Sequence, residues 1–373
     1  MSSPDIACPP RAIQPAVIMT WLAIGVAAGC TRSEAPPAEV NGAAPVVYVV
    51  NYPLQYFAER VGGDAVDVRF PAPRDGDPAF WKPDTDAIAE YQSADLILLN
   101  GATYAKWIPR ASLPTSRMVD TSASFGERLI DVEADTTHRH GPAGEHAHGG
   151  TAFTTWLDFD QAIAQAQAVH DALARRRPAN ADAFGANLEA LTSDLRKLDE
   201  QLMSIAREID GEPLVASHPV YQYWARRYGF NLQSVTLESD VVPDDRAMGV
   251  LKTILADHPA KIMIWEGDPD PQSVELLRTI GVRSVVFDPC GNIPDEGDFL
   301  TAMERNAEAL REVLAAVSAV SSAEPIAVAM PEPPGALLRQ SHVRPHLVSP
   351  AAGPVSLENL VRSRTGVKLR PCY

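Results

Sequence analysis

The feature that most constrains the fold is one long amphipathic helix near the middle of the chain. Between residues 188 and 209, apolar residues recur at alternating spacings of three and four, which is the repeat of one helical face. The stripe consists of Leu188, Leu191, Leu195, Leu198, Leu202, Ile205 and Ile209. At about 1.5 Å per residue, such a helix spans roughly 30 Å. A helix of this length predicts a stiff strut between two bodies rather than a loose hinge.

Short apolar strands alternate with amphipathic helical stretches on both sides of this helix. The first series comprises the segments VVYVVN, PLQYFAERVGG, VDVRF, AIAEYQSAD and LILLN. The second series comprises PLVASH, YQYWARRYG, SVTL, KIMIWE, VELLRTIG and SVVFDP. Such alternation is typical of mostly parallel sheets that carry helices on their faces. We therefore expect an α/β fold with two similar lobes joined by the long rigid helix.

The domain boundaries follow from the same patterns. We expect residues 46–156 to form an N-terminal α/β lobe and residues 211–318 to form a C-terminal α/β lobe. Residues 157–210 form the helical region that includes the linking helix. Residues 319–373 lose all periodicity in segments such as PEPPG and SHVRPH, which is typical of a disordered tail.

The N-terminus has the features of a secretory signal. An apolar run over residues 12–26 is followed by Ala-Ala-Gly-Cys, which ends at Cys30. This ending resembles a bacterial lipobox, so we expect residues 1–30 to be a signal peptide with a lipid on Cys30, and residues 31–45 to be a flexible tether. A plain signal peptide or a short membrane anchor is the alternative, although the run is shorter than the roughly 20 residues of a spanning helix. The predicted location is extracytoplasmic, as a membrane-anchored lipoprotein.

Net charge and the absence of catalytic motifs exclude several classes of function. The formal net charge is -16, and no segment has the basic density that nucleic-acid binding requires, so we expect no nucleic-acid partner. The chain has no P-loop, no GxSxG and no HExxH motif, and we expect no enzymatic activity. With Cys30 acylated, Cys290 and Cys372 either pair or stay free.

A histidine-rich segment points to transition metals. Four of the nine histidines lie in the eleven residues HRHGPAGEHAH, namely His138, His140, His146 and His148. Neutral imidazole suits Zn, Cu, Ni and Fe, and a chain interrupted by Gly and Pro lets several rings converge without a fixed geometry. We expect this His-rich loop, residues 135–150, to collect metal rather than to hold it in a closed site. The alternative is a solvated loop that binds metal only adventitiously.

Five segments, taken in order, resemble the metal-binding (zinc and manganese) class of ABC-transporter solute-binding proteins. They are NYPLQYFAERVGGD, ADLILLNG, WLD, SHPVYQYWARRYG and VVFDPCG, within a match from about Val46 to Val317. The His-rich insertion before WLD and the lipoprotein-like leader agree with this class. The resemblance implies a monomer of two α/β lobes that holds a metal ion in the cleft between them and docks on an ABC permease.

The ligand positions of this family are only partly kept. Where the family has the His of a DPH motif, this chain has Ala79, and where it has a His two residues before the Trp of WLD, this chain has Thr154. The third and fourth positions match His218 and Asp288. Alanine and a neutral threonine do not replace imidazole, so the resemblance implies an incomplete set of ligands.

Three interpretations of the missing ligands remain open. Carboxylates near strand ends complete the coordination, with Asp77, Glu238 and Glu266 as candidates, or the His-rich loop brings a histidine into the cleft. In the third interpretation the cleft takes a chelated metal or an organic ligand between aromatic walls. The candidate walls are Phe80, Trp81, Trp156 and Tyr221.

The sequence therefore predicts a receptor for a divalent transition metal, with zinc as the first choice and manganese as the second. The alternative function is a lipid-anchored metal scavenger or chaperone that works through the His-rich loop. Purely structural roles are the alternative for the two kept ligands, since His218 can cap the following helix and Asp288 can form a turn. We expect His258, which precedes a proline, to face solvent.

Overall fold

The computed structural model describes residues 42–132, 137–139, 145–147 and 150–322. They contain two four-stranded sheets whose strands are all parallel. The first sheet has the order β2 (Asp67–Arg69), β1 (Val46–Val49), β3 (Leu96–Leu99), β4 (Met118–Asp120). The second has the order β10 (Leu232–Ser234), β9 (Leu214–Ala216), β11 (Ile262–Trp265), β12 (Arg283–Val286). Both sheets follow the same order along the chain, which confirms the prediction of two similar α/β lobes.

Each sheet carries helices of its own, and we use first lobe and second lobe for the two sheets with these helices. The first lobe has α1 (Tyr52–Gly62) and α2 (Thr85–Ser93); the second has α5 (Gln222–Tyr228), α6 (Asp245–Asp257) and α7 (Pro271–Thr279). Short 3-10 helices are η1 (Gly63–Ala65), η2 (Ile108–Arg110), η3 (Thr115–Arg117), η4 (Ala123–Arg128), η6 (Thr155–Leu157) and η7 (Pro178–Asn180). The central strands VVYV and LILL are buried because helices cover both faces of a parallel sheet.

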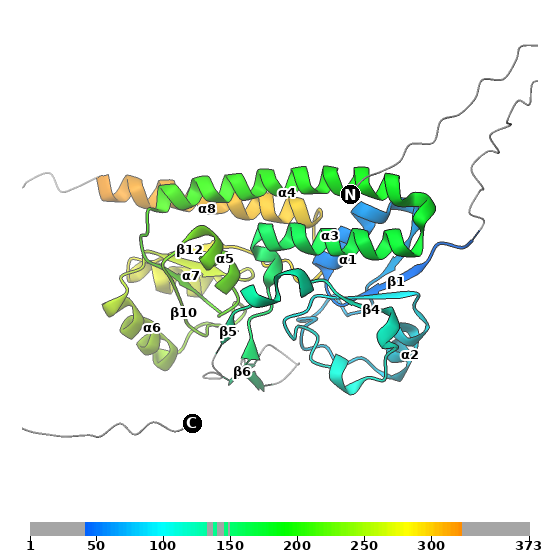
Figure 1. The fold of residues 1–373 in the computed structure, drawn as a ribbon. Coiled ribbons are helices and arrows are strands. Elements are labelled where there is room, and N and C mark those ends of the chain that lie inside the picture. The colour runs from blue at the N-terminus through cyan, green and yellow to red at the C-terminus, as the bar shows by residue number, and fades with distance from the viewer. Residues whose placement is uncertain (1–41, 133–136, 140–144, 148–149, 323–373) are drawn as a thin grey trace, which may run out of the picture. The chain divides into compact units, whose positions relative to one another are not determined.

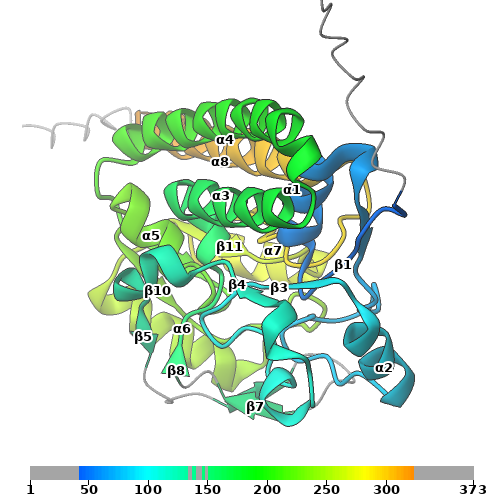
Figure 2. The ribbon, with the colours of Figure 1, turned by 45° about the vertical axis from the view of Figure 1, so that its right-hand side comes forward.

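Three long helices join the lobes: α3 (Phe159–Arg176), α4 (Ala181–Ile209) and α8 (Phe299–Ser322). Figures 1 and 2 show α4 and α8 side by side along the same side of both sheets. Every residue of the predicted apolar stripe is buried on α4, which confirms the linking helix. The helix ends at Ile209 and is followed by Asp210, which has a φ of 48° in the left-handed region that is typical of helix C-termini. The return of α8 along α4 was not predicted.

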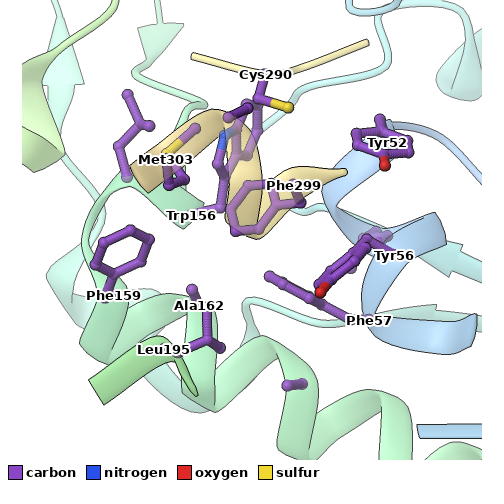
Figure 3. Packing of buried hydrophobic residues seen from close by; sticks show 14 of the residues in the cluster. Tyr52, Tyr56, Phe57, Trp156, Phe159, Ala162, Leu195, Cys290, Phe299 and Met303 are labelled. Carbon is purple, nitrogen blue, oxygen red and sulfur yellow. The ribbon is translucent and has the colours of Figure 1, made fainter. Parts of the chain in front are cut away.

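The main hydrophobic core lies under these helices and is continuous between the lobes. Figure 3 shows Phe57 of α1, Leu195 of α4 and Phe299 of α8 in one cluster, with Trp156 beside them. The Phe57 and Phe299 ring centroids are 5.5 Å apart at 82°, an edge-to-face contact that aromatic quadrupoles favour. A second cluster, which includes Val215, Met263 and Trp265, is confined to the second lobe.

Two short antiparallel pairs connect β4 to η6. Strand β5 (Asp131–Val132) pairs with β8 (Gly150–Thr151), and β6 (Thr137–Arg139) pairs with β7 (Glu145–Ala147). His138 lies opposite His146 in the second pair. His140, His148, Cys30 and the segment 323–373 lie outside the described residues.

His258 is buried, so the prediction that it faces solvent is wrong. Its Nε2 atom lies 2.7 Å from the carbonyl oxygen of Leu214. The chain turns after α6 into the second sheet, and this turn carries the ring inward against β9.

Among the described residues, none of the helices combines the length and the apolar character that a membrane span requires.

The apolar face of α4 should dominate the stability of the fold. Leu195→Ala deletes a fully buried side chain and should lower the free energy of unfolding by about 2–5 kcal/mol. Arg196→Ala, at the exposed neighbouring position, should change it by no more than about 0.5 kcal/mol. Urea denaturation followed by circular dichroism measures both, and equal effects of the two variants would contradict the assigned face.

An ion pair between α1 and α4 should make stability depend on pH. Arg60 and Asp194 are 2.8 Å apart, and Arg60, followed by Lys197, lowers the pKa of the Asp194 carboxyl. A carboxyl with a lowered folded pKa stabilises the fold above its ordinary pKa, and the stabilisation is lost as the pH falls through the folded value. Asp194→Asn should therefore cost up to about 1 kcal/mol at pH 7, and this difference should disappear in strong acid. Denaturation at both pH values tests the sign.

Candidate functional site

Four potential metal ligands follow the carboxyl ends of the strands of the second sheet. His218 follows β9, Glu238 follows β10, Glu266 follows β11 and Asp288 follows β12. Carboxyl ends of parallel strands share one edge, which is where open α/β sheets bind ligands. The three carboxylates line a pocket of about 600 Å³ that also receives Asp77 from the first lobe.

His218 lies beneath this pocket between two carboxylates. Its side chain is fully buried, its Nε2 atom is 3.5 Å from Oε1 of Glu238, and its Nδ1 atom is 3.1 Å from Oε1 of Glu266. Two ligand atoms bound to one tetrahedral zinc ion lie about 3.4 Å apart, given metal–ligand distances near 2.1 Å. The separation of Nε2 and Oε1 therefore suits a shared ion, while Glu266 is placed to orient the ring through Nδ1.

Asp288 is held by its backbone as well as by its side chain. Its amide donates to Oδ1 of Asn306 at 3.0 Å, and Nδ2 of Asn306 donates to its carbonyl oxygen at 2.7 Å. Its Oδ1 accepts a hydrogen bond from the amide of Cys290 at 2.6 Å, which is a turn interaction. Burial is the main cause that raises the pKa of Asp288. The residue thus has the turn role considered above and also lines the pocket.

The first lobe offers fewer donor atoms to the pocket. Oδ1 of Asp77 accepts a hydrogen bond from the amide of Ala79 at 2.8 Å, and the Ala79 side chain is fully buried. Thr154 lines the pocket, but its hydroxyl donates a hydrogen bond to the carbonyl oxygen of Val220 in the second lobe. Among the residues that the structure describes, no group of three or more His, Cys, Asp or Glu is arranged to hold a metal ion.

The predicted aromatic walls are mostly wrong. Trp156 lines the pocket, whereas Phe80, Trp81 and Tyr221 do not. Trp81 packs inside the first lobe, with its ring centroid 6.0 Å from that of Trp107, and the Tyr221 hydroxyl donates to the carbonyl oxygen of Phe287 at 2.7 Å. Trp81 and Tyr221 pack into the cores of their own lobes. They were mispredicted because the spacing of aromatic residues along the chain does not specify where their side chains point.

Sequence reasoning missed several residues of the pocket wall, among them Tyr104, Phe153 and Asn292. Tyr104 and Phe153 contribute rings from the first lobe, with centroids 5.4 Å apart. Asn292, from the second lobe, donates from Nδ2 to the carbonyl oxygens of residues 73, 74 and 76 at 2.8–3.1 Å. The only signal for Asn292 was its position just after the FDPCG segment.

Other hydrogen bonds fix the same loop of the second lobe against the first. Nε1 of Trp156 donates to the carbonyl oxygen of Pro289 at 2.7 Å, and the amide of Tyr52 donates to the carbonyl oxygen of Gly291 at 3.1 Å. Together with Asn292, these bonds hold the two walls of the pocket in a defined spacing.

The family of the chain is established by a sequence match. Residues 47–313 match the family described as zinc-uptake complex component A, periplasmic. This match covers most of the chain, so the chain belongs to that family, as its motifs predicted.

Individual relatives are distant. The chain is 24% identical over 280 residues to zinc-binding protein AdcA of Streptococcus pyogenes serotype M3, covering 70% of this chain and 54% of AdcA, so it spans about half the length of that relative. It is 24% identical over 298 residues to the high-affinity zinc uptake system protein ZnuA of Bacillus subtilis, covering 78% of this chain and 93% of ZnuA. The crystal structure of the metal-dependent lipoprotein YcdH from Bacillus subtilis is similar, with a TM-score of 0.61, 22% identity, and coverage of 72% of this chain and 98% of that one. That likeness supports the two-lobed fold.

Asn292 should stabilise the first-lobe loop that carries Asp77. Asn292→Ala removes the three hydrogen bonds that its side chain donates to this loop, and we expect roughly fivefold faster exchange of the Phe80 and Trp81 amides, which corresponds to about 1 kcal/mol of lost local stability. Asn231→Ala, at an exposed position of the second lobe with one long hydrogen bond, is the control. Hydrogen exchange read by mass spectrometry tests this, and unchanged protection would show that Asn292 does not hold the loop.

Proposed function

We propose that the chain is an extracytoplasmic receptor that captures a divalent transition metal in the pocket between its lobes and delivers it to an ABC permease. Membership of a zinc-uptake family supports a role in metal transport. AdcA is a zinc-binding protein and ZnuA belongs to a zinc uptake system, which supports zinc as the preferred ion; manganese is the second choice. The protein acts as a monomer and performs no covalent chemistry.

The observation that carries this proposal is the pair formed by His218 and Glu238. Their 3.5 Å separation suits two ligands of one ion, and Glu266 at 3.1 Å supports the ring from its other side. Glu238 thus takes the ligand role and Glu266 the orienting role. Asp288 and Asp77 face the same pocket and supply further carboxylate oxygens.

The His-rich loop and the N-terminus complete the proposed mechanism. His138, His140, His146 and His148 collect ions at low supply and pass them to the pocket, because clustered imidazoles bind transition metals without a fixed geometry. Residues 1–30 are the signal peptide, and a lipid on Cys30 keeps the receptor at the membrane near its permease. Residues 319–373 have no assigned role.

A second candidate function is a lipid-anchored scavenger that binds metal only through the His-rich loop. It is favoured by the finding that no three ligand side chains are arranged around one point in the described residues. Loss of the loop histidines distinguishes the two functions, because a scavenger would lose its binding while a transport receptor would keep its pocket site.

Calorimetric titration of the metal-free protein with zinc tests the proposal. His218→Ala and Glu238→Gln should each weaken the tight site at least 100-fold, and Glu266→Gln should weaken it about 10- to 100-fold, as expected for an orienting partner. Glu200→Gln, at an exposed position on α4, is the control and should bind as the unmodified chain does.

Two results would contradict the proposed pocket site. An unchanged tight site in His218→Ala would remove His218 and the proposed pocket from the mechanism. Replacement of all four loop histidines by alanine should remove only weak binding, and a loss of all binding in that variant would favour the scavenger.

A further inference from the structure

The pocket is larger than a metal ion requires. Its volume is about 600 Å³, whereas one water molecule occupies about 30 Å³, so an ion with six waters needs roughly 200 Å³. Pockets for small organic ligands measure about 300–1,000 Å³. The space beyond His218 and Glu238 is therefore of the size of a small organic molecule.

Tyr104 places a free donor in that space. Its side chain is 2% exposed, and its hydroxyl makes no hydrogen bond within the described part of the chain. Burial, and then the charge of Asp77, raise the pKa of Tyr104, so the hydroxyl stays protonated and acts as a donor. A buried donor without an acceptor destabilises the protein, and a guest with an acceptor atom would remove this cost.

Gly291 faces the Tyr104 hydroxyl across a gap about one methyl group wide. A Cβ atom added there would lie 3.5 Å from the Tyr104 hydroxyl and 3.5 Å from the Trp156 ring. Both distances are ordinary contacts, so alanine fits at this position but fills the gap. Tyr104, Trp156 and Gly291 all line the pocket.

The turn that presents Tyr104 is strained. Gly101, Ala102 and Thr103 have φ values of 76°, 48° and 54°, and the amide of Tyr104 closes the turn on the carbonyl oxygen of Gly101 at 3.0 Å. Left-handed backbone is unfavourable for alanine and threonine, because it brings Cβ too close to the following carbonyl oxygen. Such strain clusters at ligand-binding sites, where it holds a side chain in position.

The charge of the pocket selects the kind of guest. Among the described residues, five acidic side chains line it, Asp77, Glu238, Asp240, Glu266 and Asp288, against one basic side chain, Arg74. An anionic chelator would be repelled, whereas a dication bound to a neutral nitrogen ligand would be attracted. Among the described residues, His218 is the one imidazole at this site and the other candidate ligands are carboxylates, so a nitrogen chelator adds the class of donor that is scarce there.

We propose that the pocket binds its metal ion together with a small, neutral nitrogen chelator of the amine or imidazole class, which lies beside Tyr104, Trp156 and Gly291. This inference rests on the proposed function, because the metal itself is held by His218 and Glu238. Its nitrogen atoms complete the coordination of the metal, and an oxygen atom that does not bind the metal, such as the carboxylate of an amino acid without net charge, accepts a hydrogen bond from the Tyr104 hydroxyl.

Zinc titrations at matched free-zinc concentration, with and without L-histidine, test the inference. L-histidine should increase zinc affinity at least tenfold, and native mass spectrometry should show a complex of protein, one zinc ion and one histidine. Tyr104→Phe and Gly291→Ala should each reduce this gain five- to tenfold and leave the affinity for zinc alone unchanged. Gly249→Ala, on an open face of α6, is the control for the second variant.

Three outcomes would overturn the inference: no gain from L-histidine, a gain of equal size with citrate, or a gain that survives both pocket variants. These outcomes leave the proposed function standing as long as zinc alone binds in a His218-dependent manner. If zinc binds neither alone nor with L-histidine at a site that requires His218, the proposed function fails and this inference fails with it.

Discussion

The structure depends on the burial of one apolar helix face. The stripe on α4 packs against α3 and α8 and forms part of a core that continues from the first lobe into the second. Because Leu195 and Phe299 belong to the same cluster as Phe57 of α1, the lobes cannot separate without exposing that core. At about 25 cal/mol per Å² of apolar surface, such exposure is costly, so the helices set the position of both sheets.

This fixed arrangement gives the two walls of the pocket different chemistry. The carboxyl edge of the second sheet carries His218 and three carboxylates. The corresponding edge of the first sheet carries neutral side chains that bond to one another: Asn100 accepts hydrogen bonds from Asn51 and Gln165, and Gln165 also donates to Thr121. The charged donors that attract a metal are therefore concentrated on one lobe, and the other lobe supplies shape, aromatic surface and Asp77.

Much of the fold was predictable because its signals are local. The repeat on α4, the strands VVYV and LILL and the order of the motifs all appear in the sequence and are confirmed. The path of α8 was missed, since its amphipathic pattern does not say which face of which helix it will cover. The inward turn of His258 was missed because the residue before a proline has no fixed direction relative to a sheet.

The sequence by itself determined the class of the protein: two parallel α/β lobes and a rigid linking helix. These are properties of residue identity and spacing. Only the tertiary structure decided that His218 lies between Glu238 and Glu266, that Tyr104 points a donor at the pocket, and that Trp81 and Tyr221 do not line it. The physical reason is that these side chains come from loops far apart in the chain, and packing of the lobes alone brings them together.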